Sequence, residues 1–351
     1  MTEFAVREQP RSAPAYHRGD RVRVRSAEEI LATLDANGDV GGMPFMPEML
    51  QYAGREFPVY ASAHKTCDAI NLTGTSRQLD RTVHLDKLRC DGSAHGGCQA
   101  GCLLFWREEW LEPVDRSQPR PAGEPPPATG GITPERLAAA TQTGDAAGET
   151  GFRCQATEQL RASRHISGFN PQQYVTDLRT RNVRPGTLLA GLAVLVFNRY
   201  QALSRRLLPS WLRIRDGRSY PFYRGTGTGQ RTPEQELQPG DLVEIRSQAE
   251  IMATLHPDTN NNAGLWFDPE MVPACGRRAR VERRVERIIN ESTGRMRKLR
   301  DCYVLEDVIC TGFYRKFCQR AVLMYWRSAW LRRIEPEPAG GESRGGDRPP
   351  G

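Results

Sequence analysis

Four cysteines and two histidines near the start of the chain have residue types and a spacing that suit a metal centre. Three of the cysteines share one glycine-rich loop at 90–102, and the fourth lies upstream in a His-Lys-Thr-Cys segment. Four thiolates can hold a tetrahedral zinc ion or an iron–sulfur cluster, and an imidazole can replace a thiolate. The sequence therefore predicts a zinc or iron–sulfur site whose candidate ligands are Cys67, Cys90, Cys98, Cys102, His64 and His95.

The loop at 90–102 is suited to wrapping around a bound group. Gly92, Gly96, Gly97 and Gly101 allow tight turns of the backbone. Backbone N–H groups turned inward can then hydrogen bond to sulfur. The cysteine spacing differs, however, from the short Cys-X-X-Cys of common zinc ribbons, and small buried cysteines are frequent in protein cores. A purely structural role for these cysteines is therefore an open alternative.

An internal repeat places a second group of cysteines near the C-terminus. The segment at 19–26, Gly-Asp-Arg-Val-Arg-Val-Arg-Ser, matches Gly-Asp-Leu-Val-Glu-Ile-Arg-Ser at 240–247. Further matches follow in the same order, among them Glu48 with Glu270 and Trp106 with Trp326. Such a series predicts two copies of one module. A second thiolate site in the later copy would use Cys275, Cys302, Cys310 and Cys318.

The elements that position these residues are expected to be short strands. The matched openings at 19–26 and 240–247 alternate apolar and polar residues, as half-buried strands do. Several short strands between glycine-rich turns favour a small barrel or an open sandwich. The Gly-Asp-X-Val opening resembles the first strand of SH3-like barrels, including those of the KOW type. The expected fold is therefore α+β, with two tandem copies of a small β-rich, SH3-like barrel joined by a proline-rich linker and a helical connector.

The composition along the chain predicts six segments. Proline and glycine are concentrated at 116–131 and after 334, which is typical of linkers and tails. Apolar residues recur at helical spacing within 187–207, and the wide apolar face predicts a buried helix. We expect a disordered N-terminus at 1–15, the first repeat at 16–114, a linker at 115–132, a helical connector at 133–235, the second repeat at 236–334 and a disordered tail at 335–351.

Composition also narrows the classes of protein. The net charge of +7 comes from 49 basic and 42 acidic residues, and a basic chain is compatible with an anionic partner. The N-terminal residues lack the apolar core of a signal peptide, and the longest uncharged apolar run is about half a membrane span. We therefore expect a cytoplasmic protein without a membrane partner. The nine cysteines then suit metal binding or reactivity better than disulfides.

A basic segment in the second repeat suggests an anionic partner more directly. Residues 276–300 are rich in arginine and precede an aromatic pair at 313–314. Arginine beside aromatic residues suits single-stranded nucleic acid, whereas an exposed edge hairpin can also carry charge simply to prevent edge pairing. The candidate anion-binding residues are Arg277, Arg278, Arg280, Arg283, Arg284, Arg297 and Lys298.

These patterns favour a cytoplasmic metal- or iron–sulfur-binding accessory protein that docks a protein partner through the second repeat. A metal- or cluster-dependent redox enzyme is one alternative, with Cys98 or Cys102 as a reactive thiol or His95 as a proton donor. A nucleic-acid-binding tandem barrel is another. The matched carboxylates Glu48 and Glu270, each in a Pro-Glu-Met segment, suit a buried cap or an acid–base group.

Overall fold

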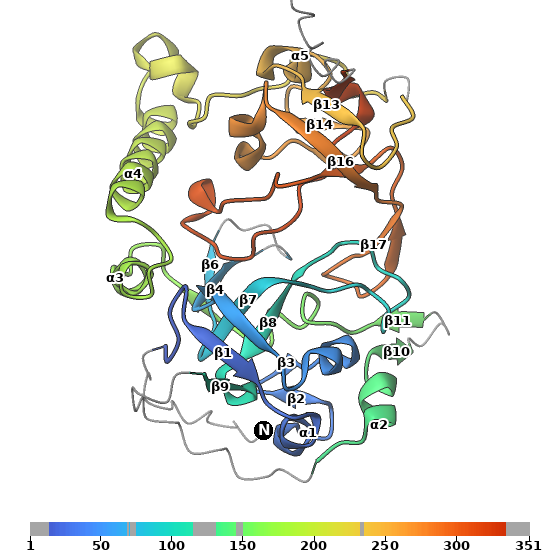
Figure 1. Cartoon of the computed structure of the whole chain (residues 1–351). Coiled ribbons are helices and arrows are strands. Elements are labelled where there is room, and N and C mark those ends of the chain that lie inside the picture. Colours follow the sequence, from blue (N-terminus) through green and yellow to red (C-terminus); the bar gives the residue numbers. More distant parts are fainter. Residues whose placement is uncertain are drawn as a thin grey trace, which may run out of the picture.

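The computed structural model describes residues 14–68, 70, 75–114, 131–144, 150–231 and 235–334. Most of the expected N-terminal tail and linker, and all of the C-terminal tail, lie outside these described residues. The described chain mixes helix and sheet in two β-rich halves, the first within 16–114 and the second within 236–334. The halves stack on one another, and the two helices within 172–207 run along one side (Figure 1).

The first half is organised around a sheet that curls into a half-barrel (Figure 1). Val22 and Val24 are completely buried and alternate with arginines, which explains why this segment forms a strand with one face on the core. Its neighbours are antiparallel to it on both sides. The sheet has the order β8-β7-β4-β1-β9 and consists of β1 (Arg21–Val24), β4 (Glu56–Ser62), β7 (Thr82–Arg89), β8 (Leu103–Arg107) and β9 (Leu111–Pro113).

The second half contains a sheet in which the order of four strands is repeated. Its order β19-β16-β13-β20 corresponds to β7-β4-β1-β9. Val243 lies opposite Ala279, as Val22 lies opposite Phe57. The register of both strand pairs shifts once, after Val281 in β16 and after Val59 in β4. The strands are β13 (Leu242–Ile245), β16 (Arg278–Arg284), β19 (Tyr303–Leu305) and β20 (Leu331–Arg333).

Each half has its own core around two tryptophans. Trp106 and Trp110 are completely buried in the first, and Trp326 and Trp330 in the second. Trp110 donates a hydrogen bond to Thr33, and Trp330 donates the equivalent bond to Thr254. The short helix α1 (Ala27–Thr33) is capped by the side chain of Ser26, and α5 (Gln248–Met252) is capped in the same way by Ser247.

Smaller strands lie outside the two main sheets, and some of them approach the boundary between the halves (Figure 1). Two hairpins from opposite halves, β5–β6 and β17–β18, lie there (Figure 1). The strands are β2 (Asp39–Val40), β3 (Met43–Pro44), β5 (Lys65–Cys67), β6 (Ser76–Gln78), β10 (Gln142–Gly144), β11 (Thr150–Phe152), β12 (Arg164–Ile166), β14 (Asn261–Asn262), β15 (Leu265–Trp266), β17 (Arg287–Ile289) and β18 (Met296–Lys298).

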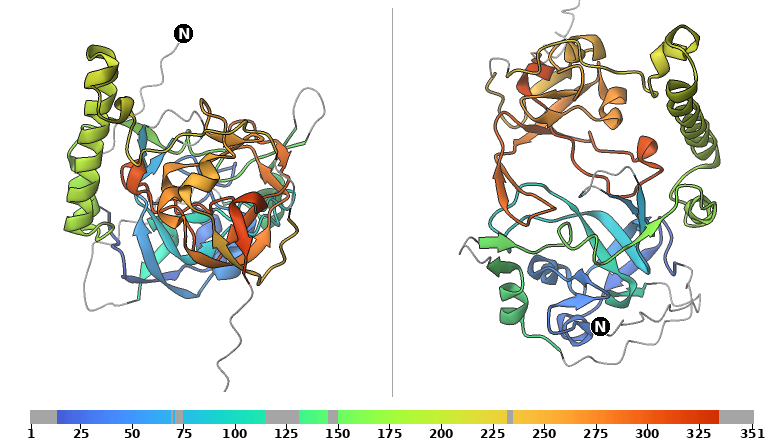
Figure 2. Two further views of the ribbon diagram at one scale, coloured as in Figure 1. Left: turned by 90° about the horizontal axis from the view of Figure 1, so that it is seen from above. Right: turned by 180° about the vertical axis from the view of Figure 1, so that it is seen from behind.

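The connector contains α2 (Pro134–Ala139), α3 (Gln172–Arg179) and α4 (Pro185–Leu207). The helix predicted over 187–207 is present as α4, but the prediction that it is buried is wrong. It lies at the edge of the molecule (Figure 2), and Leu189, Val196 and Leu207 are each about 70% exposed. Only a narrow face, which includes Leu188 and Gly191, packs on the protein. Among the described residues, no helix has the length and apolar character needed to cross a membrane.

Candidate functional site

The cysteine loop at 90–102 is closed by its own backbone. Cys90 N–H donates to the carbonyl of Cys102 at 2.8 Å, and Gly97 N–H donates to that of Gly92 at 2.9 Å. Gly92 has a φ of +75°, and a Cβ at this position would lie 2.1 Å from the carbonyl oxygen of Cys98. Glycine is therefore required here, and the turn directs Cys90 and the following histidine toward the interior.

Within this loop, Cys90 and His95 meet a carboxylate from a distant segment. The 3₁₀ turn Pro47–Tyr52 places Glu48 beside them. The Cys90 thiol donates to Glu48 Oε1 at 3.4 Å and lies 3.3 Å from His95 Nε2, while His95 Nδ1 lies 3.8 Å from Glu48 Oε1. Among the described residues, these three form the group of potential metal ligands whose donor atoms all lie within 4.8 Å of one another.

Burial governs the ionisation of this Glu48–Cys90–His95 cluster. Glu48 is 8% exposed and His95 is 1% exposed. Loss of hydration raises the pKa of Glu48, raises that of Cys90 and lowers that of His95. Glu48 Oε2 and His95 Nδ1 are buried and have no hydrogen-bond partner. A cation bound among these side chains would compensate for the lost hydration, because its positive charge stabilises both the carboxylate and the thiolate.

A small cavity of about 30 Å³ adjoins the cluster. Cys90 and His95 line it, and Cys98, Cys102 and Cys154 complete a wall rich in sulfur. Cys154 has no counterpart in the second copy of the repeat, so the repeat does not point to it as a ligand. It approaches the other thiols because the segment after β11 folds back over the first half.

The structure separates the other predicted ligands of the first site. Cys67 N–H donates to the sulfur of Cys318, a residue of the second half, at 3.1 Å. Cys98 accepts a hydrogen bond from Ile289 N–H at 3.3 Å and so also contacts the second half. His64 Nε2 lies 3.3 Å from a carboxylate oxygen of Asp177 in α3. Of the six predicted residues, Cys90 and His95 are therefore the pair that joins Glu48.

The second predicted set is also dispersed. Cys275 donates to the carbonyl of Met271, Cys302 donates to that of Arg300, and Cys318 contacts Cys67. Within the described residues, no three of Cys275, Cys302, Cys310 and Cys318 bring their sulfurs to within ligand distance of one another.

Cys310 lies on a loop that resembles the one at 90–102 but carries different chemistry. Gly312 has a φ of +72°, and Phe317 N–H donates to its carbonyl at 2.8 Å. Glu270 accepts hydrogen bonds from Thr311 and from the backbone N–H of Tyr314. Arg315 occupies the loop position that corresponds to His95, and it forms an ion pair with Asp268.

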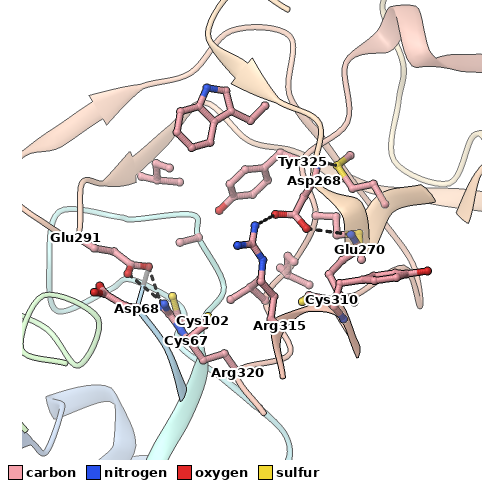
Figure 3. Close-up of a pocket in the computed structure, with 18 of the residues that line it drawn as sticks. Cys67, Asp68, Cys102, Asp268, Glu270, Glu291, Cys310, Arg315, Arg320 and Tyr325 are labelled. Atoms are coloured by element: carbon pink, nitrogen blue, oxygen red, sulfur yellow. Dashed lines mark hydrogen bonds and ion pairs between the residues drawn. The ribbon is translucent and has the colours of Figure 1, made fainter. Parts of the chain in front are cut away.

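A larger cavity of about 410 Å³ lies between the halves (Figure 3). Its walls include the thiols of Cys67, Cys102 and Cys310. Arg320, which is 5% exposed, forms two hydrogen bonds with Glu291 at 2.7 and 3.2 Å in this wall. Much of the remaining lining is apolar, so the cavity combines thiols, paired charges and hydrophobic surface.

The predicted basic hairpin packs against the cysteine loop. The side-chain oxygen of Gln99 accepts hydrogen bonds from the N–H groups of Glu286 and Arg287 at 2.6 and 3.2 Å. Arg283 is partly buried and donates to the carbonyl of Gln99. The other predicted anion-binding residues are exposed, namely Arg277, Arg278, Arg280, Arg284, Arg297 and Lys298.

Comparison with known proteins gives no relative, since no family model, curated protein or solved structure matches the chain.

Proposed function

We propose that this protein is a zinc-binding accessory protein whose first half holds the ion at Glu48, Cys90 and His95. The observation that supports this proposal is the convergence of three donor atoms within 4.8 Å, two of them on buried side chains with an unpartnered polar atom. A buried polar atom without a hydrogen-bond partner costs free energy unless a water molecule or an ion binds it. A cation at the cluster would do so.

The donor set favours zinc over an iron–sulfur cluster. Thiolate, imidazole and carboxylate are all common zinc ligands, and a zinc site needs four in total. An iron–sulfur cluster normally takes four cysteine ligands, whereas only Cys90 contributes sulfur to this group. A fourth zinc ligand can come from a thiol at the adjoining cavity, where Cys98, Cys102 and Cys154 lie.

The size of the cavity favours a structural role over catalysis. A volume of about 30 Å³ holds roughly one or two water molecules. A catalytic zinc site keeps one position open to a substrate, which needs far more room. We therefore prefer the accessory protein to the metal-dependent enzyme.

Metal analysis of purified protein tests this proposal. After dialysis against a chelating resin, we expect about one zinc per chain, and Cys90→Ser and His95→Ala should each lose it. Cys310→Ser is the matched control, because Cys310 has the same place in the second half and no neighbouring histidine in the corresponding loop position. A wild-type protein free of zinc, or a Cys90→Ser variant that retains it fully, would contradict the assignment.

We infer further that the two halves are tandem copies of one SH3-like barrel in a cytoplasmic protein. Support comes from the shared order of four strands, the matched register irregularity and the paired tryptophans. The two halves should then unfold as separate units, which differential scanning calorimetry can detect as two transitions. A single transition that both Trp106→Phe and Trp326→Phe shift equally would count against two independent barrels.

Nucleic-acid binding is the second candidate function. The exposed arginines of β16 and β18 favour it, because they add positive charge to the surface of the second half. Binding to a fluorescent single-stranded DNA should then weaken steeply as salt increases. Absence of binding at low salt would contradict nucleic-acid binding, and a protein would then be the remaining candidate partner of the basic surface.

A further inference from the structure

Two contacts across the boundary between the halves are equivalent in position but differ in chemistry. Cys67 N–H donates to the sulfur of Cys318 at 3.1 Å, and Ile289 N–H donates to the sulfur of Cys98 at 3.3 Å. Cys67 ends β5 and Ile289 ends β17, and each lies eight residues after the matched valine at which its sheet register shifts. Only the first contact therefore brings two thiols together.

The loop positions of the two acceptor sulfurs match as closely. A Cβ on Gly92 would lie 2.1 Å from the carbonyl oxygen of Cys98, and one on Gly312 would lie 2.0 Å from that of Cys318. The same tight turn thus presents Cys98 to one neighbour and Cys318 to the other. The contact between Ile289 and Cys98, which contains one thiol, is therefore an internal control for the contact between Cys67 and Cys318, which contains two.

The surroundings of the Cys67–Cys318 pair favour reaction between the two sulfurs. The thiols share a hydrogen bond, which lowers the pKa of Cys318 to about 7 and raises the pKa of Cys67. The buried cations Arg320 and Lys65 lie near enough to stabilise a thiolate at this pair. One thiolate beside one thiol is the arrangement from which a disulfide forms.

An oxidant can reach the pair from the cavity between the halves. Cys67 is partly exposed and forms part of the wall of the cavity of about 410 Å³ (Figure 3), whereas Cys318 is buried. A molecule as small as hydrogen peroxide fits this volume easily. The cavity therefore gives the pair access to solvent that its burial would otherwise prevent.

We propose that Cys67 and Cys318 are a peroxide-sensitive dithiol site that forms a reversible disulfide between the two halves. One sulfur of the pair attacks a peroxide oxygen, the O–O bond breaks, and a sulfenic acid and one water result. The second sulfur displaces the sulfenic hydroxyl, so that an S–S bond forms and a second water leaves. Overall, two thiols and one hydrogen peroxide give one disulfide and two waters, and a dithiol reductant reverses the change.

The bond would connect residues that are 251 positions apart in the chain. It would lock the boundary that contains the cavity and the basic hairpin, while leaving the cysteine loop at 90–102 intact. The proposal is independent of zinc, since neither sulfur belongs to the Glu48–Cys90–His95 cluster.

The test is peptide mapping of the full chain after treatment with a few equivalents of hydrogen peroxide and blocking of free thiols in denaturant. We expect titratable thiols to fall from nine to seven, a peptide that joins Cys67 to Cys318, and full recovery with dithiothreitol. Cys67→Ser should abolish the linked peptide, whereas Cys98→Ser should preserve it. The zinc content of the oxidised protein should not change.

A gain-of-function variant keeps the proposal testable if Cys67→Ser folds poorly. Ile289→Cys recreates the pair at the equivalent contact, so a second linked peptide should join positions 289 and 98. Oxidation of Cys67 or Cys318 to sulfinic acid without a link, or links that join other cysteines at random, would overturn the proposal. Two unreacted thiols under conditions that oxidise exposed cysteines would do the same.

Discussion

His84 should make the stability of the protein depend on pH. This residue of β7 is fully buried, and its ring contacts Phe105 at a centroid distance of 4.5 Å. Its Nδ1–H donates to the carbonyl of Leu104 at 2.8 Å, while Nε2 has no partner. A proton added at Nε2 would therefore be a buried charge without a hydrogen-bond acceptor.

The size of this pH effect on stability follows from the pKa of His84. Burial lowers the pKa of His84 from 6.5 to about 4, and the nearby guanidinium groups of Arg320 and Arg89 act in the same direction. Below pH 6.5 the unfolded chain binds a proton that the folded chain does not accept until about pH 4. The contribution of neutral His84 to stability is complete above pH 6.5 and decreases as the pH falls. The total loss by pH 4 is about 3 kcal/mol.

Urea unfolding of the wild type and His84→Gln at several pH values between 4 and 7.5 measures this effect. Glutamine keeps a donor for the carbonyl of Leu104 but does not titrate in this range. The difference in unfolding free energy between the two proteins should therefore change by about 3 kcal/mol across the range, in the direction that favours the variant at low pH. A difference that stays constant with pH would refute a buried neutral histidine.

Two further predictions concern stability. Asp177→Ala should lower the free energy of unfolding by about 3 to 5 kcal/mol, because it leaves the ammonium group of Lys65, which is 1% exposed, without its anion. The double change Lys65→Met/Asp177→Leu removes both charges and should cost much less. Urea unfolding of the three variants compares these costs. Leu203→Ser on the exposed face of α4 should change stability by no more than about 0.5 kcal/mol, whereas Trp330→Ala in the second core should cost about 3 to 5 kcal/mol.

Local patterns in the sequence predict local structure well here. The alternation around Val22 gives β1, and the apolar residues at helical spacing within 187–207 give α4. Cys90 and His95 are five residues apart on a loop that glycine closes tightly, so their proximity follows from their spacing. In these cases the relevant interactions lie within one element or one turn.

Contacts between distant segments could not be predicted in the same way. Glu48 reaches Cys90 only because the turn that follows β3 packs beside the cysteine loop. The sequence predicts that Cys67 joins the loop cysteines, yet β5 directs it across to Cys318 in the second half. The exposure of α4 is also not predictable from the sequence. An apolar stripe indicates which face of a helix can be covered, but not whether another segment covers it.

The two cysteine loops adopt the same backbone closure, although only the first carries the histidine of the proposed zinc site. Cys310 N–H donates to the carbonyl of Val322 at 2.9 Å, as Cys90 N–H does to that of Cys102 at 2.8 Å. The loop of the second half thus adopts the same closure with an arginine ion pair in place of histidine. Glycine and backbone hydrogen bonds are therefore sufficient to fix this conformation. The donor atoms of the first half are accordingly held near one another by the fold itself, so zinc binding should require little rearrangement.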